Sequence, residues 1–164
     1  MRKAEHCDLD RIMQIIKGTI EEMNAGGNDQ WDDNYPQSKD FARDIENGDL
    51  FVEETDGKVE GFICINYEEP EEYNGLNWSS DEKAMVIHRM SVSIDSRKQG
   101  IATRLIRYAE ELAAAKGITY LKTDTYSFNT KMNGLLAKIG YKRIGEMSFH
   151  GKENPFYCYE KFLR

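Results

Sequence analysis

The sequence predicts an α/β (α+β) fold in which a mixed sheet is covered by helices. An early pair of β-type stretches has the signature of a hairpin, and later β-type stretches alternate with helical ones in βαβ order. The 164 residues are 40% hydrophobic and 31% charged, which is typical of one globular domain. We therefore expect a single domain over residues 1–164.

Two helices are expected before the hairpin. Apolar residues recur at helical spacing from Asp8 to Met23, and two glycines at 26–27 end this pattern. Ser38 is the expected N-cap of a second, short helix that ends at Asn47. Between the two helices lies a polar connection over residues 29–37.

The hairpin is predicted from a two-residue turn between two β-type stretches. Asp56-Gly57 supplies the positive φ angles that such a turn needs, and it separates the expected strands 50–55 and 58–66. The next stretch, 67–83, is long, polar and acidic. We expect it to be a loop, and loops of this length in compact domains are often functional.

The second half of the chain alternates strands with helices that end at glycines. Gly117 and Gly140 are the expected helix stops. The expected elements are a strand over 84–94, a helix over 101–116, a strand over 118–125, a helix over 130–139, and a closing strand pair over 141–149 and 156–163.

The junction from Arg97 to Ala102 is the clearest functional feature. A strand ends, polar or basic residues follow, and a helix begins directly after Gly100. The first turn of a helix leaves backbone N–H groups unpaired at the positive end of the macrodipole, and a phosphate placed there satisfies them. Neither of the two common phosphate motifs, G-x-x-x-x-G-K-[ST] and G-x-G-x-x-G, occurs in the chain. A solvated basic helix face is the structural alternative.

These residues resemble the GCN5-related N-acetyltransferase (GNAT) family. Arg97-Lys98-Gln99-Gly100-Ile101-Ala102 matches the family signature [Q/R]-x-x-G-x-[G/A], and a second block from Asn129 to Tyr141 matches N-x(5)-L-x-x-K-x-G-[FY]. The resemblance implies a mixed, mostly antiparallel sheet of about six or seven strands flanked by about four helices. In the structural alternative, Asn129 only caps a helix, Gly140 only ends it, and Tyr141 is a core residue.

The resemblance also implies acetyl-CoA as co-substrate and an amine acceptor. The pantetheine arm would pair with the strand around Met90, and a backbone N–H there would stabilise the oxyanion. The residues expected to bind acetyl-CoA are Met90, Ser91, Val92, Arg97, Lys98, Gln99, Gly100, Ile101, Ala102, Thr103, Asn129 and Lys138.

His88 is the predicted general base. It lies four residues before Val92 on the strand expected to line the reaction centre, and imidazole has an unperturbed pKa of about 6.5. His88 and Arg89 are neighbours in a β segment, so their side chains face opposite ways. A hydrogen-bonded structural role for His88 is the alternative.

The general acid departs from the family pattern. The family often has Tyr seven residues after the motif Asn129, and that position here is Leu136, which cannot donate a proton. Tyr126 is the predicted substitute. A thiolate whose conjugate acid has a pKa of about 8.5 is also a tolerable leaving group without an acid.

Trp31 and Tyr35, in the connection between the first two helices, are the candidate walls of the acceptor pocket, with packing on the core as the alternative. The acidic residues of the 67–83 stretch could attract a cationic amine, although such runs are usually only solvated. The chain leaves open which amine is the acceptor.

Composition excludes several other classes. A net charge of −7 argues against general nucleic-acid binding, and no apolar run approaches the length of a membrane span. Three scattered cysteines have no metal-ligand spacing, which favours a cytoplasmic protein without a metal. A homodimer is possible, because dimers are common in families of this kind. Two other functions stay open: a non-catalytic acyl-CoA sensor, and an interaction module whose basic segment binds an acidic partner.

Overall fold

The structure is a computed structural model of the chain, and it describes residues 1–163. Its elements are, in chain order, β1 (Arg2–Lys3), η1 (His6–Asp8), α1 (Leu9–Ala25), α2 (Ser38–Glu46), β2 (Leu50–Thr55), β3 (Lys58–Asn66), η2 (Glu71–Gly75), β4 (Met85–Val92), η3 (Ile94–Ser96), α3 (Ile101–Ala115), β5 (Tyr120–Tyr126), α4 (Thr130–Lys138), β6 (Lys142–Met147) and β7 (Phe156–Phe162).

The strands form one mixed sheet in the order β1-β2-β3-β4-β5-β7-β6. β4 and β5 run parallel, whereas the pairs β1–β2, β2–β3, β5–β7 and β6–β7 are antiparallel. The prediction of a mixed, mostly antiparallel sheet of six or seven strands with four α-helices is confirmed. The parallel pair follows from the long crossover through α3, as a βαβ unit requires.

Two compact units can be described. The N-terminal unit comprises Met1–Ile65 and Arg89–Tyr108, and the C-terminal unit comprises Asn66–His88 and the chain from Ala109 onward. The chain therefore passes from one unit to the other within β4, between His88 and Arg89. The expectation of one domain over residues 1–164 stays a prediction.

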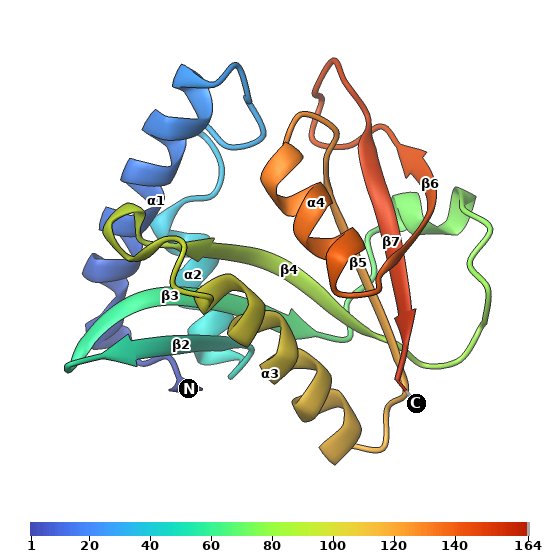
Figure 1. The fold of residues 1–164 in the computed structure, drawn as a ribbon, viewed down its shortest axis with the longest axis horizontal. Helices are drawn as coiled ribbons and strands as arrows, with labels where there is room; N and C mark the ends of the chain where they lie inside the picture. Colours follow the sequence, from blue (N-terminus) through green and yellow to red (C-terminus); the bar gives the residue numbers. More distant parts are fainter. Residues whose placement is uncertain (164) are drawn as a thin grey trace. The chain divides into compact units, whose positions relative to one another are not determined.

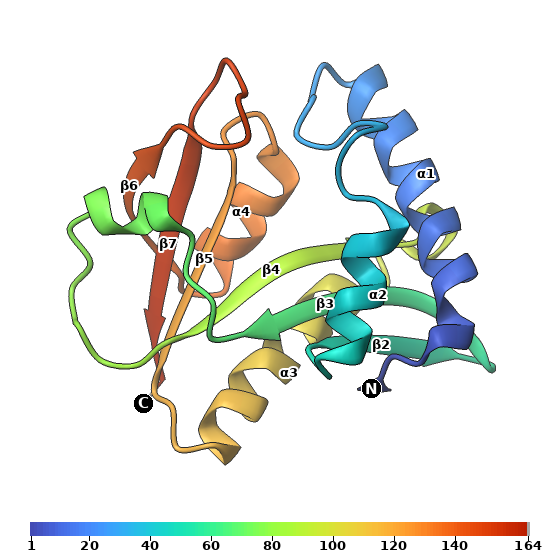
Figure 2. The same cartoon turned by 180° about the vertical axis from the view of Figure 1, so that it is seen from behind.

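In the N-terminal unit, helices α1 and α2 cover one face of strands β2 and β3 (Figures 1 and 2). Ile12 and Ile16 of α1 and Phe41 of α2 are almost inaccessible there and pack with Leu50 and Phe62 of the strands. Burial of each such side chain contributes about 1.5–3 kcal/mol, so this cluster holds the two helices on the sheet.

The first half of α3 covers the opposite face of β3, where close approach requires a glycine. A Cβ added at Gly61 would lie 3.0 Å from the side chain of Ile101 and 3.2 Å from that of Leu105. The same Cβ would lie 3.2 Å from the carbonyl oxygen of Ser91 on β4. Gly61 therefore lets the start of α3 sit directly on the sheet, which positions the turn that precedes the helix.

In the C-terminal unit, polar side chains tie helices to one face of β7 and the 67–83 segment to the other. Tyr159 donates to Asn133 of α4 at 2.7 Å, and Lys161 donates to Glu110 of α3 at 2.8 Å. On the opposite face, Glu160 accepts from the backbone N–H of Ser79 at 3.0 Å. The alternating direction of strand side chains explains this division.

Patterns among neighbouring residues of the sequence predicted the bounds of most helices and strands to within two or three residues. The turn at Asp56-Gly57 has φ angles of 52° and 74°, and Thr55 pairs with Lys58, so the predicted two-residue hairpin is confirmed. The prediction of Ser38 as an N-cap is wrong by one position, because the cap is Gln37. Asp40 accepts from the Gln37 N–H at 2.8 Å and draws that residue into the cap.

The strand expected over 84–94 ends earlier, at Val92. Residues Ile94–Ser96 turn away as a short 3-10 helix, in which the N–H of Ser96 donates to the carbonyl of Ser93 at 3.0 Å. β-type composition at Ile94 suggested a longer strand, but this side chain is exposed rather than packed in the sheet.

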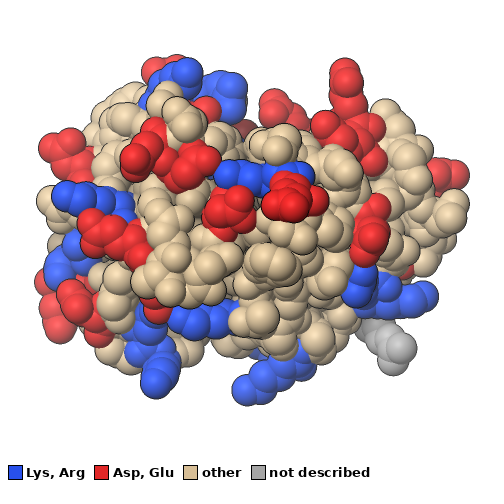
Figure 3. Space-filling view, turned by 90° about the horizontal axis from the view of Figure 1, so that it is seen from above, with Lys and Arg blue, Asp and Glu red and all other residues tan. Residues whose placement is uncertain are grey.

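Acidic and basic side chains are interspersed over the face of the molecule drawn in Figure 3. Within residues 1–163, no helix combines the length and the apolar character needed to cross a bilayer.

Candidate functional site

The turn before α3 has the backbone geometry of an anion site. Lys98 and Gly100 have φ angles of 63° and 77°, and left-handed residues in such turns let successive N–H groups converge on one concavity. The first bond that closes onto the turn runs from the N–H of Arg104 to the carbonyl of Gly100, at 3.0 Å. The N–H groups that precede Arg104 in the first turn have no carbonyl partner within the helix, and they lie at the positive end of the helix dipole.

Two arginines hold the shape of this turn. Arg97 donates through Nε to the carbonyl of Val92 at 3.3 Å, and its guanidinium forms an ion pair with Glu22 of α1. Arg104 donates through Nη1 to the carbonyl of Gln99 at 2.9 Å. These contacts tie Arg97 to β4 and α1, whereas Lys98 is exposed. Flanking positive charge from both residues at a phosphate stays a prediction.

The strand residues expected to bind the co-substrate are buried. Met90 and Val92 are each 8% exposed, and Ser91 is joined to Thr19 of α1 by a hydrogen bond of 2.7 Å between their hydroxyl oxygens. The Ser91 hydroxyl therefore ties β4 to α1, and binding of a co-substrate by these strand residues stays a prediction. In the turn, Ile101 is buried beneath the helix, while Ala102 and Thr103 are half-buried beside it.

His88 and Arg89 point to different partners, as β geometry requires. The His88 Nε2 lies 2.7 Å from Oδ1 of Asn66, the last residue of β3. Asn66 lies 22 residues before His88 in the sequence, so no local signal pointed to this contact. A structural role for the contact and a catalytic role for the ring are compatible, since a hydrogen bond also orients a base.

Arg89 is the centre of a buried cluster that sequence reasoning missed. It donates to both carboxylate oxygens of Asp44 on α2, at 2.7 and 2.9 Å, and to the hydroxyl of Tyr35 at 2.8 Å. The side chains of Arg89 and Asp44 are only 11% and 4% exposed. Tyr35, a predicted wall of the acceptor pocket, is therefore fixed to β4 through a charged anchor.

The two buried cysteines, Cys64 and Cys158, are unsuited to act as nucleophiles. Cys64 adjoins this cluster, and burial raises the pKa of its thiol well above its usual range. Burial also raises the pKa of Cys158 to about 12. Both thiols stay protonated near neutral pH, so neither presents the thiolate that covalent catalysis needs.

Tyr126 and Leu136, which bear on the general acid, are both buried. Tyr126 is fully inaccessible, and its hydroxyl accepts from the side-chain amide of Asn154 at 3.2 Å. Its ring packs against Phe156 with the ring centres 5.1 Å apart. Leu136 is 2% exposed. The role of Tyr126 as proton donor stays a prediction, and the contact with Asn154 does not use the hydroxyl proton that such a donor would give to the departing sulfur.

Asn129 caps α4, as the structural alternative states. Its side-chain oxygen accepts from the N–H of Met132 at 3.2 Å. Asn133, which the sequence did not single out, reinforces the same corner by donating to the carbonyls of Tyr126 and Asn129 at 3.1 and 2.9 Å. Lys138 is exposed at the last turn of α4. Binding of a co-substrate by Asn129 and Lys138 stays a prediction.

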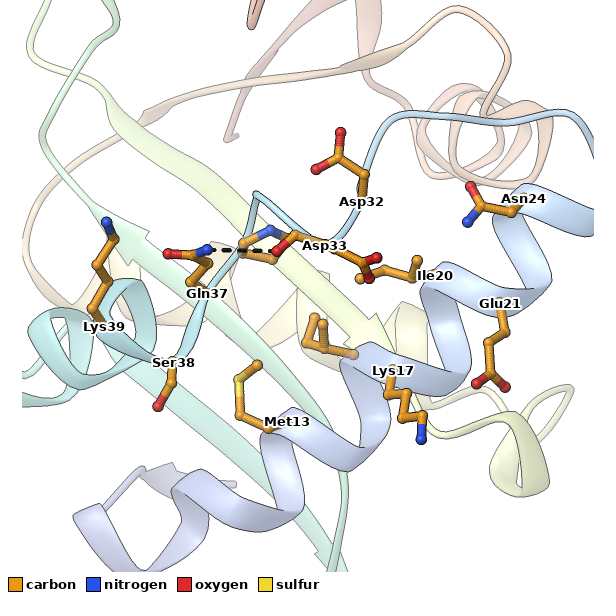
Figure 4. Close-up of a pocket in the computed structure, with 12 residues that line it drawn as sticks. Met13, Lys17, Ile20, Glu21, Asn24, Asp32, Asp33, Gln37, Ser38 and Lys39 are labelled. Carbon is orange, nitrogen blue, oxygen red and sulfur yellow. Dashed lines mark hydrogen bonds between the residues drawn. The ribbon is translucent and has the colours of Figure 1, made fainter.

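A cavity of about 590 Å³ lies between α1 and the segment that leads into α2 (Figure 4). Ile16 and Ile20 of α1 and Pro36 give it an apolar lining, and Asp32 and Asp33 contribute carboxylates. Gln37 bridges back to the carbonyl of Asp33 across this segment at 3.5 Å.

Neither of the two predicted acceptor walls is among the residues that line this cavity, and the two differ in exposure. Trp31 is 5% exposed and belongs to the core of the N-terminal unit, so packing on the core describes its present position. Tyr35 is half-buried against the same core.

Within residues 1–163 the structure holds no group of three or more His, Cys, Asp or Glu side chains arranged to bind a metal ion.

The N-terminal unit brings together the turn, the last part of β4, the Arg89 cluster and the segment bearing Tyr35. The C-terminal unit holds His88, Tyr126, Asn129 and Lys138.

Comparison with known proteins gives a consistent result. Residues 14–141 match the model of the acetyltransferase (GNAT) family. A GNAT-family acetyltransferase from Streptococcus agalactiae is 26% identical and superposes with a TM-score of 0.87, covering 99% of this chain and 94% of that one. YesJ, an uncharacterized N-acetyltransferase of Bacillus subtilis (strain 168), is 23% identical over 87% of this chain and 81% of its own length. The fold also matches yncA of Salmonella typhimurium, solved with its cofactor acetyl-CoA, at 14% identity and a TM-score of 0.73, over 99% and 92% of the two chains.

Proposed function

Because the chain belongs to the acetyltransferase (GNAT) family, we propose that it is an acetyl-CoA-dependent N-acetyltransferase that moves an acetyl (acyl) group to a primary amine. The observation that carries the proposal is the turn from Arg97 to Ala102. Its left-handed Lys98 and Gly100 and the unpaired amides of the first turn of α3 suit a pyrophosphate. The acetyl-CoA seen with the yncA fold supports the choice of co-substrate.

The reaction proposed is direct transfer in a ternary complex. The lone pair of the amine nitrogen attacks the thioester carbonyl carbon, the carbonyl becomes an oxyanion, and the C–S bond then breaks so that CoA leaves as a thiolate. A backbone N–H of β4 near Met90 is the proposed donor to the oxyanion. The proton released by the amine passes to a base of the enzyme or to water.

The base is needed because the acceptor amine is protonated near neutral pH. An alkyl amine has a pKa of about 10.4, so its deprotonation at pH 7 costs about 4.6 kcal/mol. His88, two residues before Met90 on β4, is the proposed proton acceptor, directly or through water. Tyr126 is the proposed donor to the thiolate, and departure without an acid is the other route that the leaving group permits.

The acceptor is proposed to enter beside the segment that carries Trp31 and Tyr35. The lining of the adjacent cavity carries the carboxylates of Glu21, Asp32 and Asp33 against the two cations of Lys17 and Lys39, and this small excess of negative charge favours a cationic ligand. Which amine this is stays open between polyamines, aminoglycosides, amino acids, peptide N-termini and protein lysines.

Two measurements test the proposal. Acetyl-CoA should raise the melting temperature in a thermal-shift assay, with a stabilisation of RT ln(1 + [L]/Kd). Release of free thiol should then follow when cadaverine, kanamycin, lysine and a peptide with a free N-terminus are each added with acetyl-CoA. Stabilisation without thiol release from any amine would favour the acyl-CoA sensor, and the absence of saturable stabilisation would favour the interaction module.

A pair of glycine variants separates binding at the turn from general damage. Gly100 and Gly117 have φ angles of 77° and 72° on either side of α3, and a Cβ at Gly117 meets nothing within 4 Å. Gly100→Trp should abolish the acetyl-CoA shift by filling the space of the phosphates. Gly117→Trp carries a similar backbone penalty and should retain the shift. Equal shifts in both variants would contradict a phosphate site at the turn.

A further inference from the structure

Asn66 occupies a position at which one oxygen serves two donors. It is the last residue of β3 and is 9% exposed. Its Oδ1 accepts from the backbone N–H of Glu68 at 2.9 Å and lies 2.7 Å from Nε2 of His88. The two contacts belong to the same oxygen, at the point where the 67–83 segment leaves the sheet.

The contact with Glu68 decides which way the amide of Asn66 faces. A backbone N–H can only donate, so the Asn66 atom that faces it must be the oxygen rather than the NH₂ group. The same oxygen then faces His88, and Nε2 of the ring must carry the hydrogen that it accepts. In the neutral imidazole the remaining nitrogen lone pair is therefore on Nδ1.

We propose that Asn66 is a positioning residue that holds His88 in the Nε2–H tautomer, so that Nδ1 is the nitrogen that accepts the amine proton. The inference rests on the proposed function, because it gives a role in proton transfer to a contact that is otherwise structural. The two hydrogen bonds also fix the rotation of the ring, since an oxygen tied to the backbone cannot follow a ring that turns away. A neutral amide orients the imidazole without adding a charge that would hold it protonated.

Several titratable groups of the C-terminal unit share the sheet face of His88. The register of β4 with β5 pairs Val86 with Lys122, so side-chain alternation puts His88, Lys122 and Asp124 on one face. The 67–83 segment adds its own groups to that face. Tyr73 donates to Asp124 at 2.7 Å, and Glu69 pairs with Lys122 at 2.8 Å. Glu68 and Glu72 belong to the same segment, and Glu72 acts electrostatically on Asp124. On β7, Glu160 pairs with Lys122 and Cys158 pairs with Asp124, so their side chains face the same side.

The direct test is the tautomer and titration of His88 by ¹⁵N NMR of the free protein, with His88→Gln used to assign its signals. The wild-type ring should show Nε2–H and an unprotonated Nδ1. Asn66→Asp keeps the oxygen that accepts from Glu68 and adds a negative charge beside Nε2. This variant should raise the pKa of His88 by about one unit. A wild-type ring in the Nδ1–H tautomer, or an unshifted titration in Asn66→Asp, would overturn the inference.

Asn28 provides a matched control. Its side-chain oxygen accepts from the backbone N–H two residues on, at Gln30, with a length of 3.0 Å, and it is 8% exposed. Asn28→Asp therefore makes the same change of charge in the same kind of turn, but outside the unit that holds His88. It should leave the titration of His88 unchanged. Asp124→Asn serves as a second control, since Asp124 titrates in the same pH range.

The kinetic arm uses acetyl-CoA with the amine of the panel that releases thiol fastest. The acidic limb of the kcat/KM profile should move to higher pH by about one unit in Asn66→Asp, matching the shift of the His88 titration, with KM for acetyl-CoA unchanged. A limb that does not follow the His88 titration would overturn the catalytic meaning of the contact. Absence of thiol release from every amine would instead overturn the proposed function, while the NMR result would still stand by itself.

Discussion

At the scale of single residues, the Arg89–Asp44 pair is the interaction whose loss should cost most. Both charges are almost completely buried, and Arg89 also donates to Tyr35. A buried ion pair adds little net stability compared with apolar residues, but removal of one partner leaves an uncompensated charge. The pair is therefore best understood as a device that fixes the segment bearing Tyr35 to the strand bearing Met90.

Arg89→Met should lower the free energy of unfolding by about 3–5 kcal/mol, because it leaves the Asp44 carboxylate buried alone. The double variant Arg89→Met/Asp44→Asn should recover part of that loss, because neither charge then remains. Urea denaturation at pH 7 measures both. Glu146→Gln is the control, since its pair with Arg143 is about half exposed and should be worth at most about 1 kcal/mol. A loss in Arg89→Met no larger than in this control would refute the argument.

At the scale of elements, the parts that the sequence predicted are those with local signals. The hairpin needs only the Asp56-Gly57 turn and its flanking strands, and the end of α3 needs only Gly117. The turn before α3 was predictable because its glycine, its basic residues and the helical pattern are contiguous. These features need no knowledge of the tertiary structure.

The contacts that complete the candidate site have no local signal. Arg89 and Asp44 are 45 residues apart, and His88 and Asn66 are 22 residues apart. Sheet register and helix packing bring them together, and neither can be derived from composition or period. The sequence does indicate a turn at Asn66, because an Asn at the end of a strand often begins one. It does not indicate that His88 is a partner of this side chain.

The 67–83 segment gives a prediction at the scale of an element. Tyr73, buried within η2, donates to Asp124, and burial raises the pKa of that carboxyl to about 6. The unfolded value is about 3.9, so the folded state binds the proton more tightly. The stabilisation from this proton is complete below about pH 4 and is lost as pH rises through 6.

Asp124→Asn should remove this dependence while keeping an oxygen for Tyr73. The free energy of unfolding of the wild type relative to this variant should fall by on the order of 1–2 kcal/mol between pH 5 and 7. Urea titrations across that range measure the difference. A difference that stays constant with pH would show that Asp124 is not a proton-binding anchor of the segment.

At the scale of the whole molecule, the charges that set the pH dependence act in opposite directions. Asp124 favours the folded state as pH falls toward 5. The pKa of Asp8 is lowered by its hydrogen bonds with Arg2, and those of Glu60 and Glu160 are lowered by hydrogen bonds that outweigh burial. Carboxylates of this second kind stabilise the fold above their unfolded pKa and lose that contribution as pH falls through the folded value.

The net result should be a maximum of stability at mildly acidic pH. The net charge of −7 at pH 7 adds to this, because self-repulsion weakens as pH approaches the sequence pI of about 5.1. Free energies of unfolding from urea titrations at intervals from pH 3 to 8 should rise from pH 8 to a maximum between about 5 and 6, and fall steeply below about 4. The fall in the free energy of unfolding at acidic pH should be less steep in Glu160→Gln, because this variant removes a carboxylate that accepts hydrogen bonds from Ser79 and Tyr120. A monotonic rise from pH 3 to 8 would contradict this prediction, because it would mean that the paired carboxylates outweigh Asp124 over the whole range.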